Sequence, residues 1–201
     1  MSEKDVVRAH YLPKIAADAP GYAVCDWGGQ YSQEKRFGVL VEHIPLTQTT
    51  KLLDVGCGVG DLWGYLCRSG IACHYLGVDL LQEMTHEARR RHPDATFLPV
   101  DLFGQHAPPL ECDVAFCSGM LNLAHDEPML YLSLVAGRLR QFSSQAVMVN
   151  LLNAETHDPG PAYQTYMPEG ALNVCWAAGW RQEIISGYLP NDLTLLMTKV
   201  A

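Results

Sequence analysis

The sequence has few basic residues and no long hydrophobic run. Its 201 residues include 14 Lys and Arg against 22 Asp and Glu, a formal net charge of −8 at pH 7. Because contacts to phosphates supply most of the affinity of nucleic-acid-binding proteins, this charge disfavours a nucleic-acid partner. No apolar run approaches the roughly 20 residues of a membrane helix, and the opening MSEKDVVRAH lacks a signal-peptide core. We therefore expect a cytoplasmic protein with no membrane partner.

The cysteines include no C-x-x-C pair, and their number, seven, is odd. Both features argue against a disulfide framework and against a zinc knuckle. Several of these thiols lie in apolar segments, where cysteine behaves as a small hydrophobic side chain. The sequence therefore predicts reduced cysteines, as in the cytoplasm, and no metal site.

From Lys51 onward, short apolar runs alternate with segments of helical period, which indicates a mostly parallel sheet covered by helices. The pattern predicts strands over 51–56, 74–80, 95–103, 112–119 and 145–152, and helices over 60–69, 81–93, 128–142 and 168–179. The last two apolar runs, 182–189 and 193–200, are joined by a linker too short for a helix, so we expect them to pair antiparallel. The sheet then has six or seven strands.

Residues 30–44, ahead of the first strand, have the spacing of an amphipathic helix. Its apolar side chains recur at i, i+3, i+4 and i+7, namely Phe37, Leu40, Val41 and Ile44. No linker separates this segment from Lys51. We therefore expect a single domain over 1–201, with an N-terminal helical cap over 1–50 and the sheet-containing core over 51–201.

The strongest functional signal is LLDVGCGVGDL at residues 52–62. A buried strand runs into Gly56, Gly58 and Gly60 and then into a helix. Glycine lets the backbone turn tightly and approach a ligand closely, where a Cβ would intrude. Asp79 ends the second strand 19 residues after Gly60, a spacing at which a carboxylate reaches the hydroxyls of a ribose. These residues predict a nucleoside ligand above the carboxyl ends of the strands.

Two other interpretations stay open on these residues alone. The glycines could mark only a tight strand–helix turn, with Asp79 as a helix cap. An NAD(P)-dependent oxidoreductase is the other, but the third glycine comes one residue too early for G-x-G-x-x-G. A chain of 201 residues also leaves little room for a separate substrate domain.

The segments LLDVGCGVGDL, YLGVDL, FLPVDLF and DVAFCSG occur in the order of the motifs of the class I S-adenosylmethionine-dependent methyltransferases, which the chain resembles from about Lys51 to its end. The stretch WGGQYSQEKRF, from Trp27 to Phe37, resembles bacterial small-molecule methyltransferases. This resemblance implies a Rossmann-like, doubly wound sheet of seven mostly parallel strands, with an antiparallel strand seven and helices on both faces. It also implies S-adenosylmethionine as cofactor and S-adenosylhomocysteine as product.

The resemblance assigns cofactor contacts to the ends of the first two strands. Asp54 and the backbone of Gly56 and Gly58 would hold the methionine moiety. Asp79 would accept hydrogen bonds from both ribose hydroxyls, and Leu80 would pack against the adenine.

Further contacts are implied at the ends of strands three and four. Asp101 would accept from the adenine amino group, and the backbone N–H of Leu102 would donate to a ring nitrogen. Ser118 and Gly119 would line the passage between the sulfonium and the methyl acceptor. If the resemblance to this family is set aside, Asp101 could instead be a helix cap.

Three residues before the first strand are further candidates for cofactor binding. Arg36 offers a guanidinium fork that matches a carboxylate, and Gln33 lies one turn before it on the predicted helix. Both could instead be solvated polar residues opposite the apolar face. Trp27, followed by two glycines, could cover the cofactor or anchor the core.

Methyl transfer by direct displacement requires alignment and exclusion of water, and a base only when the acceptor must lose a proton. The catalytic candidates lie after strand four: His125 as a base and Asn122 as a residue that orients the acceptor. A surface or capping role is the alternative for His125. A member of the same fold that binds the cofactor without turnover is the third possible function.

The segment after strand four favours a small-molecule acceptor. The Asn/Asp-Pro-Pro-Tyr motif of enzymes that methylate amino groups of DNA and protein is replaced by Ser118-Gly119-Met120-Leu121. Aromatic and Met residues near the predicted mouth suit an apolar or planar acceptor, although each is also a common core residue: Trp27, Tyr31, Met120, Tyr163 and Tyr166.

Overall fold

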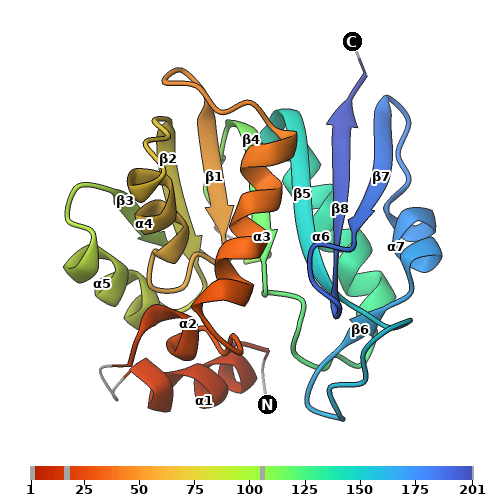
Figure 1. The fold of residues 1–201 in the computed structure, drawn as a ribbon, viewed down its shortest axis with the longest axis horizontal. Helices are drawn as coiled ribbons and strands as arrows, with labels where there is room; N and C mark the ends of the chain where they lie inside the picture. The colour runs from red at the N-terminus through yellow and green to blue at the C-terminus, as the bar shows by residue number, and fades with distance from the viewer. Residues whose placement is uncertain (1–2, 16–18, 105–106, 201) are drawn as a thin grey trace.

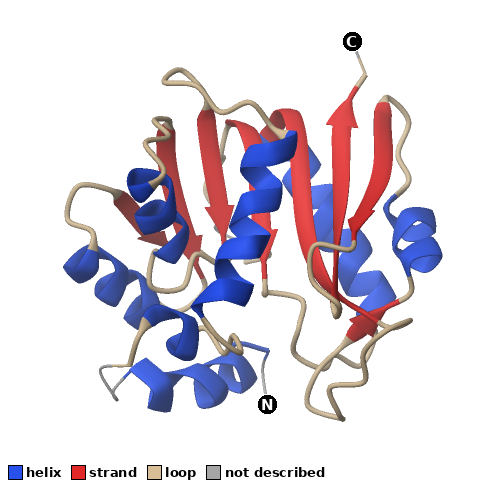
Figure 2. Ribbon diagram, viewed as in Figure 1, coloured by secondary structure: helices blue, strands red, loops and turns tan. Residues whose placement is uncertain are grey.

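The computed structural model describes residues 3–15, 19–104 and 107–200, and it places a twisted sheet between two layers of helices (Figures 1 and 2). The strands are β1 (Lys51–Val55), β2 (His74–Asp79), β3 (Thr96–Pro99), β4 (Cys112–Ser118), β5 (Ser143–Asn153), β6 (Thr165–Tyr166), β7 (Trp180–Ser186) and β8 (Asp192–Lys199). The helices are α1 (Glu3–Ile15), α2 (Gly21–Val24), α3 (Gln30–His43), α4 (Asp61–Arg68), α5 (Gln82–Arg91), α6 (Pro128–Phe142) and α7 (Pro168–Cys175).

The strand order is β3-β2-β1-β4-β5-β8-β7, and the short β6 pairs with β5. β8 runs antiparallel to both of its neighbours, whereas β1, β2, β3, β4 and β5 are parallel. The chain therefore builds outward from β1 in one direction and then returns to β4 on its other side. Such a reversal leaves a crevice at the carboxyl ends of the strands. The predicted Rossmann-like fold with one inserted antiparallel strand is confirmed.

Alternating side chains of β1 enter two different cores. Leu52 packs with Phe37 and Leu40 of α3 and with α4, while Leu53 and Val55 pack with the helices of the opposite face. In Figure 1, α3 crosses in front of the sheet and α6 lies behind it. Because both faces are covered, β1 is buried at every position except Lys51, as the sequence predicted for a central parallel strand.

Helices α1 and α2 lie beneath the carboxyl ends of β1, β2 and β4 (Figure 1). Val7, Tyr11 and Ile15 of α1 pack on a small cluster that includes Leu81 and Met84 from the start of α5. The helical segment predicted over 1–50 therefore divides into two parts. Its first two helices cover the edge of the sheet where a ligand is expected, whereas α3 belongs to one helical layer.

The predicted boundaries are wrong at two places. β3 ends at Pro99 because Asp101 starts a turn, in which its Oδ1 accepts from the N–H of Phe103 at 3.0 Å. α7 ends at Cys175 rather than at residue 179, and β7 begins directly after Gly179, which has φ +78°. In the described part of the chain, no helix is long and apolar enough to span a membrane.

Candidate functional site

The loop between β1 and α4 bends sharply under the end of β1. Gly56, Gly58 and Gly60 all have positive φ, at 72°, 53° and 86°. The N–H groups of Gly56 and Cys57 donate to the carbonyl of Val78, so the loop is fixed to β2. A Cβ on Gly58 would lie 2.5 Å from Sγ of Cys25. A larger side chain at position 58 would therefore push away the segment that carries Cys25. Because these glycines carry no Cβ atoms, the loop leaves an open space next to it at the carboxyl ends of the strands.

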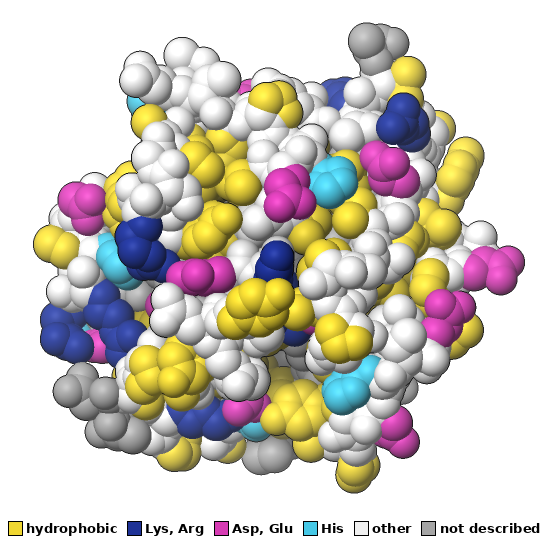
Figure 3. Space-filling view, viewed as in Figure 1, with side chains coloured by type: hydrophobic (Ala, Val, Ile, Leu, Met, Phe, Trp, Pro, Cys, Tyr) yellow, Lys and Arg dark blue, Asp and Glu magenta, His cyan; other side chains and the backbone are white. Residues whose placement is uncertain are grey.

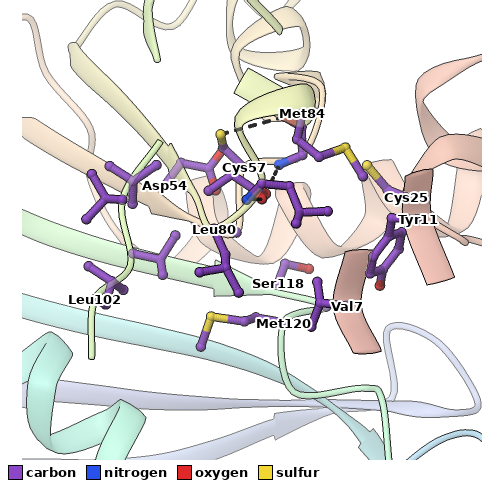
Figure 4. Close-up of a pocket in the computed structure, with 18 of the residues that line it drawn as sticks. Val7, Tyr11, Cys25, Asp54, Cys57, Leu80, Met84, Leu102, Ser118 and Met120 are labelled. Carbon is purple, nitrogen blue, oxygen red and sulfur yellow. Dashed lines mark hydrogen bonds between the residues drawn. The ribbon is translucent and has the colours of Figure 1, made fainter. Parts of the chain in front are cut away.

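That space is a cavity of about 290 Å³ at the carboxyl ends of the strands. Residues from α1, from the turn before α3 and from four strand ends line it, and Figure 4 shows many of them around the opening. The cavity brings together eleven of the cofactor-binding candidates: Trp27, Gln33, Asp54, Gly56, Gly58, Asp79, Leu80, Asp101, Leu102, Ser118 and Gly119.

Asp79 lies in the floor of this cavity. Its Oδ2 accepts a hydrogen bond from the N–H of Gly58 at 3.0 Å, and its Oδ1 accepts from the N–H of Leu81 at 2.9 Å. Burial raises the pKa of Asp79 to about 6, although these backbone donors lower it. Since each carboxylate oxygen has two lone pairs, both oxygens keep one for a further donor. This geometry can receive a pair of hydroxyl groups.

Asp54 lies deeper, at the end of β1, and is 4% exposed. Its Oδ2 accepts a hydrogen bond of 2.6 Å from the hydroxyl of Tyr75. Burial raises the pKa of Asp54 to about 7, with only the Tyr75 hydroxyl lowering it and with Asp79 and Asp61 raising it further. A cation brought next to Asp54 would favour its ionised form.

The pKa of Asp54 sets a pH dependence of stability for the unliganded protein. Between its ordinary value of 3.8 and about 7, the folded state holds a proton that the unfolded state has lost. This stabilisation is complete below about pH 4 and disappears as the pH rises to about 7. We expect Asp54→Asn, which stays neutral, to gain stability relative to the wild type between pH 4.5 and 7.5, by at most about 1.4 kcal/mol per pH unit.

Urea unfolding at these two pH values measures this difference. Asp113→Asn is the control, because hydrogen bonds from the Lys51 backbone and Ser144 lower the pKa of Asp113 from its ordinary value of 3.8. Asp113 is then ionised in both states above about pH 4.5, so the stability difference between that variant and the wild type should be nearly the same at the two pH values. A pH-independent difference between Asp54→Asn and the wild type would contradict a protonated Asp54.

Asp101 and Leu102 close the cavity on the side of β3. The Asp101 side chain is largely exposed, and one of its oxygens already accepts from Phe103, as a turn cap does. Leu102 is 6% exposed and packs into the core beneath α6. Both interpretations of Asp101 therefore coexist in the fold, because the same carboxylate caps a turn and lines the cavity.

Arg36 corrects the expectation for the front segment. Its Nε and Nη2 donate to the two oxygens of Asp192, at 3.2 and 2.5 Å, and Nη1 donates to the carbonyl of Ser32. Arg36 is 3% exposed and is not among the residues that line the cavity. The Arg36 guanidinium thus binds a carboxylate of the protein itself, that of Asp192 at the start of β8. This carboxylate balances the positive charge of Arg36.

Trp27 lies between Arg36 and the end of β4. The Arg36 guanidinium stacks 4.1 Å from the centre of the Trp27 ring. On the other side, a Cβ on Gly119 would lie 2.8 Å from Cζ2 of Trp27. Trp27 is therefore fixed against the strand end while its ring lines the cavity. Gln33 also reaches the cavity, where its Nε2 donates to Asp61 at 2.8 Å.

Residues 52–141 match a family model described as "Methyltransferase domain". Relatives include trans-aconitate 2-methyltransferase of Afipia carboxidovorans, 29% identical over 98 residues, which are 49% of this chain and 38% of that protein. The enzyme of the same name from Yersinia pseudotuberculosis is 27% identical over 139 residues, 66% of this chain and 54% of that protein. The chain spans between a third and about half of the length of the curated relatives that it matches.

Solved structures share the fold over nearly the whole chain. Magnesium protoporphyrin IX methyltransferase from Synechocystis PCC 6803, crystallised with bound SAM, has a TM-score of 0.69 at 17% identity and covers 99% of this chain and 98% of its own. A DhpI–SAM–HEP complex has a TM-score of 0.71 at 17% identity, with coverage of 98% and 99%.

Residues 52–141 are therefore similar to a methyltransferase domain, and the chain shares the fold of these solved structures.

The two residues predicted to act in catalysis lie outside the cavity lining. Nδ1 of His125 accepts from the N–H of Glu127 at 3.1 Å, and the ring stacks on Tyr131 with 4.5 Å between centroids. His125 therefore has the capping role that was its alternative, and the expectation of a base is not supported by its position. Asn122 is 8% exposed, and its buried Oδ1 has no hydrogen-bond partner among the residues that the structure describes.

The aromatic candidates from the sequence separate into different environments. Trp27 lines the cavity, together with Met120. Tyr31 is 69% exposed, and Tyr166 is buried with its hydroxyl on the carbonyl of Leu121. The hydroxyl of Tyr163 donates to Asp26 at 2.6 Å.

The contribution of α1 to the site was missed in the sequence. Val7 and Tyr11 line the cavity, and burial raises the pKa of the Tyr11 hydroxyl above its ordinary value. The helix has weak apolar periodicity and contains Pro13. Only three apolar residues, Val6, Val7 and Tyr11, indicated in the sequence that one face of it could pack against the protein. No pattern within α1 showed which surface it covers.

A polar cluster around Asp26 connects this helix to the rest of the protein. Lys14 Nζ lies 2.7 Å from Oδ1 of Asp26, and His10 Nε2 lies 2.8 Å from its Oδ2, which also accepts from Tyr163. These hydrogen bonds lower the pKa of Asp26 to about 2, although burial alone would raise that pKa.

In the described part of the chain, no group of three or more His, Cys, Asp or Glu side chains could hold a metal ion.

Proposed function

We propose that the chain binds S-adenosylmethionine in this cavity and transfers its methyl group to a small molecule by direct displacement. The observation that supports this most strongly is the placement of Asp79 beside the glycine loop, with both oxygens on the floor of one cavity. The match of residues 52–141 to a methyltransferase domain and the SAM-bound structures of the same fold support the same proposal.

The residues present fit such a cofactor. Gly56 and Gly58 adopt positive φ and carry no Cβ atoms that could block the ligand. Asp79 offers acceptors for two hydroxyl groups. Asp54 is buried at the point where the ammonium of the methionine moiety would neutralise it, which would offset the cost of its ionisation. Leu80 and Leu102 supply apolar surface for a planar ring.

When bound, S-adenosylmethionine supplies a methyl group already activated by the sulfonium. The protein then has to hold an acceptor in line with that methyl group and exclude water. Trp27, fixed by Arg36 and Gly119, and the side chains of α1 cover the cavity and can do this. His125 does not line the cavity, so we propose no base for this step.

A small molecule is the class of acceptor that the surroundings favour. Trans-aconitate and magnesium protoporphyrin IX, in the names of the relative and of the fold neighbour, are both small molecules. On the face shown in Figure 3, Lys and Arg side chains form one small group near α5 and otherwise lie among acidic ones. Within that group, Arg91 and Arg90 pair with Glu87. All seven cysteines are free, which agrees with a cytoplasmic location.

Calorimetry with S-adenosylmethionine, S-adenosylhomocysteine and NADH tests the cofactor. We expect both adenosyl compounds to bind and NADH not to bind. Release of S-adenosylhomocysteine in the presence of small acceptors then tests turnover. Tight binding of NADH alone would replace the proposal by an oxidoreductase, and cofactor binding that never leads to release would indicate a binding protein.

The hydrogen bonds around Asp26 lead to a prediction for the dissociation rate of the cofactor product. Tyr163→Phe removes the hydroxyl that ties the loop before β6 to Asp26, and so loosens the turn that leads to Trp27. A hydrogen bond to a charged group contributes about 1.5 kcal/mol or more, which corresponds to about tenfold. We therefore expect S-adenosylhomocysteine to dissociate about tenfold faster, measured by stopped-flow tryptophan fluorescence. Tyr31→Phe, at an exposed position, is the matched control, and equal rates in both variants would contradict this role.

A further inference from the structure

Beyond Ser118, the cavity is lined mainly by apolar side chains. Val7 and Tyr11 come from α1, and Met120 and Leu123 come from the loop after β4. Figure 4 shows Val7 and Met120 on the same side of the opening, close to Ser118. None of these four positions is needed for the cofactor contacts at the strand ends. They form the surface left for the acceptor.

The charged residues around the same cavity are mostly acidic. Asp54, Asp61, Asp79 and Asp101 line it, and Lys4 is the single basic residue among the described lining residues. Lys4 itself is exposed to solvent. A cavity with this excess of carboxyl groups attracts cations and repels anions.

Other cations close to the cap are neutralised by the protein itself. Lys14 pairs with Asp26 at 2.7 Å, and Arg36 holds Asp192 through two hydrogen bonds. Apart from the exposed Lys4, an anionic acceptor would have to break these pairs to recruit a counter-charge. Leaving either carboxylate without its partner would add the cost of an uncompensated charge.

We propose that the acceptor is an uncharged molecule with an apolar body, and that polycarboxylates are excluded by charge. This proposal rests on the proposed function, because the acceptor surface is defined by the space next to the cofactor. A polycarboxylate entering here would lose hydration and meet like charge without a fitting cation. The chain therefore differs in acceptor from relatives whose names specify trans-aconitate, a tricarboxylic acid.

Matched probes measured by saturation-transfer NMR test this proposal at pH 7.5. The full chain is first shown to bind S-adenosylhomocysteine by calorimetry and is then saturated with it. Indole and 4-propylphenol serve as uncharged probes, and benzene-1,3-dicarboxylate and trans-aconitate serve as polycarboxylates. We expect the uncharged probes to bind at least about tenfold more tightly than either polycarboxylate.

The outcomes separate the two proposals. A chain that fails to bind S-adenosylhomocysteine overturns the proposed function and this inference with it. Binding of S-adenosylhomocysteine together with equal or tighter binding of the polycarboxylates, or with no probe bound at all, overturns the acceptor class alone.

A charge introduced at Met120 locates the probes. Met120→Lys places a cation on the acceptor surface, so we expect uncharged probes to bind at least about fivefold more weakly and benzene-1,3-dicarboxylate more tightly. Leu134→Lys, on the exposed side of α6, is the matched control and should change neither. Probe binding that is the same in both variants would show that the probes sit elsewhere, which contradicts the proposal.

Discussion

Arg36→Ala is expected to lower the free energy of unfolding by about 3–5 kcal/mol, the usual cost of removing one partner of a buried ion pair. Arg36 is 3% exposed and Asp192 is 1% exposed, and two hydrogen bonds join them across 156 residues of sequence. Burial already raises the pKa of Asp192, against the attraction of Arg36. Without the guanidinium, the carboxyl group must take up a proton or stay buried as an unbalanced charge. Urea unfolding measures the loss.

Arg68→Ala is the matched control for this effect. Nη2 of Arg68 lies 2.7 Å from Oε1 of Glu34, but the Arg68 side chain is 60% exposed. Exposed pairs of this kind contribute about 0–1 kcal/mol. The double variant Arg36→Met/Asp192→Leu should recover most of the stability, because it leaves no unpaired charge. Similar small losses in Arg36→Ala and Arg68→Ala would contradict a structural role for the buried pair.

Asp79→Ala is expected to weaken the binding of S-adenosylhomocysteine by about 10- to 150-fold, the range that corresponds to about 1.5–3 kcal/mol for hydrogen bonds to a charged group. The carboxylate has one lone pair left on each oxygen after the N–H groups of Gly58 and Leu81. Calorimetry measures the affinity directly. An unchanged affinity would mean that Asp79 does not contact the ribose.

The control for Asp79 must separate lost ligand contacts from a distorted loop. Asp79→Asn keeps an acceptor for one backbone N–H and one hydroxyl, so its affinity should lie between those of Asp79→Ala and the wild type. Asp113→Ala removes a carboxylate at the opposite ends of the strands, where it accepts from the Lys51 backbone, and should leave the affinity unchanged. If Asp79→Asn binds as weakly as Asp79→Ala while Asp113→Ala binds like the wild type, a distorted loop rather than the lost ribose contacts accounts for the weaker binding.

The sheet and the floor of the site were predictable because local patterns carry them. A parallel strand buried on both faces reads as an apolar run, and a carboxylate at the end of each strand must lie at the same edge of the sheet. Asp54, Asp79 and Asp101 therefore come together without any knowledge of long-range packing. The antiparallel pairing of the last two strands followed from a linker too short for a crossover, whereas the insertion of β8 beside β5 was implied only by the family resemblance.

The remaining parts depend on directions and partners that no local pattern contains. Gly119 has φ +92°, so the chain turns after β4 in a way that brings Met120 and Leu123 to the cavity. Asn122 and His125, in the same loop, are not among its lining residues, and position in the sequence alone could not distinguish them. Arg36 was assigned to a ligand because its partner, Asp192, is distant in sequence.

The position of β8 has a consequence for synthesis of the protein. β8 separates β5 from β7, so until Asp192–Lys199 has been made, β7 lacks its strand partner and β5 lacks its neighbour on one side. Nascent chains that still lack β8 thus carry two unprotected sheet edges, the state most exposed to aggregation. Arg36 likewise lacks its counter-ion until Asp192 has been made. The sheet is therefore completed only once β8 has been made, and chains that stop before Asp192 should aggregate.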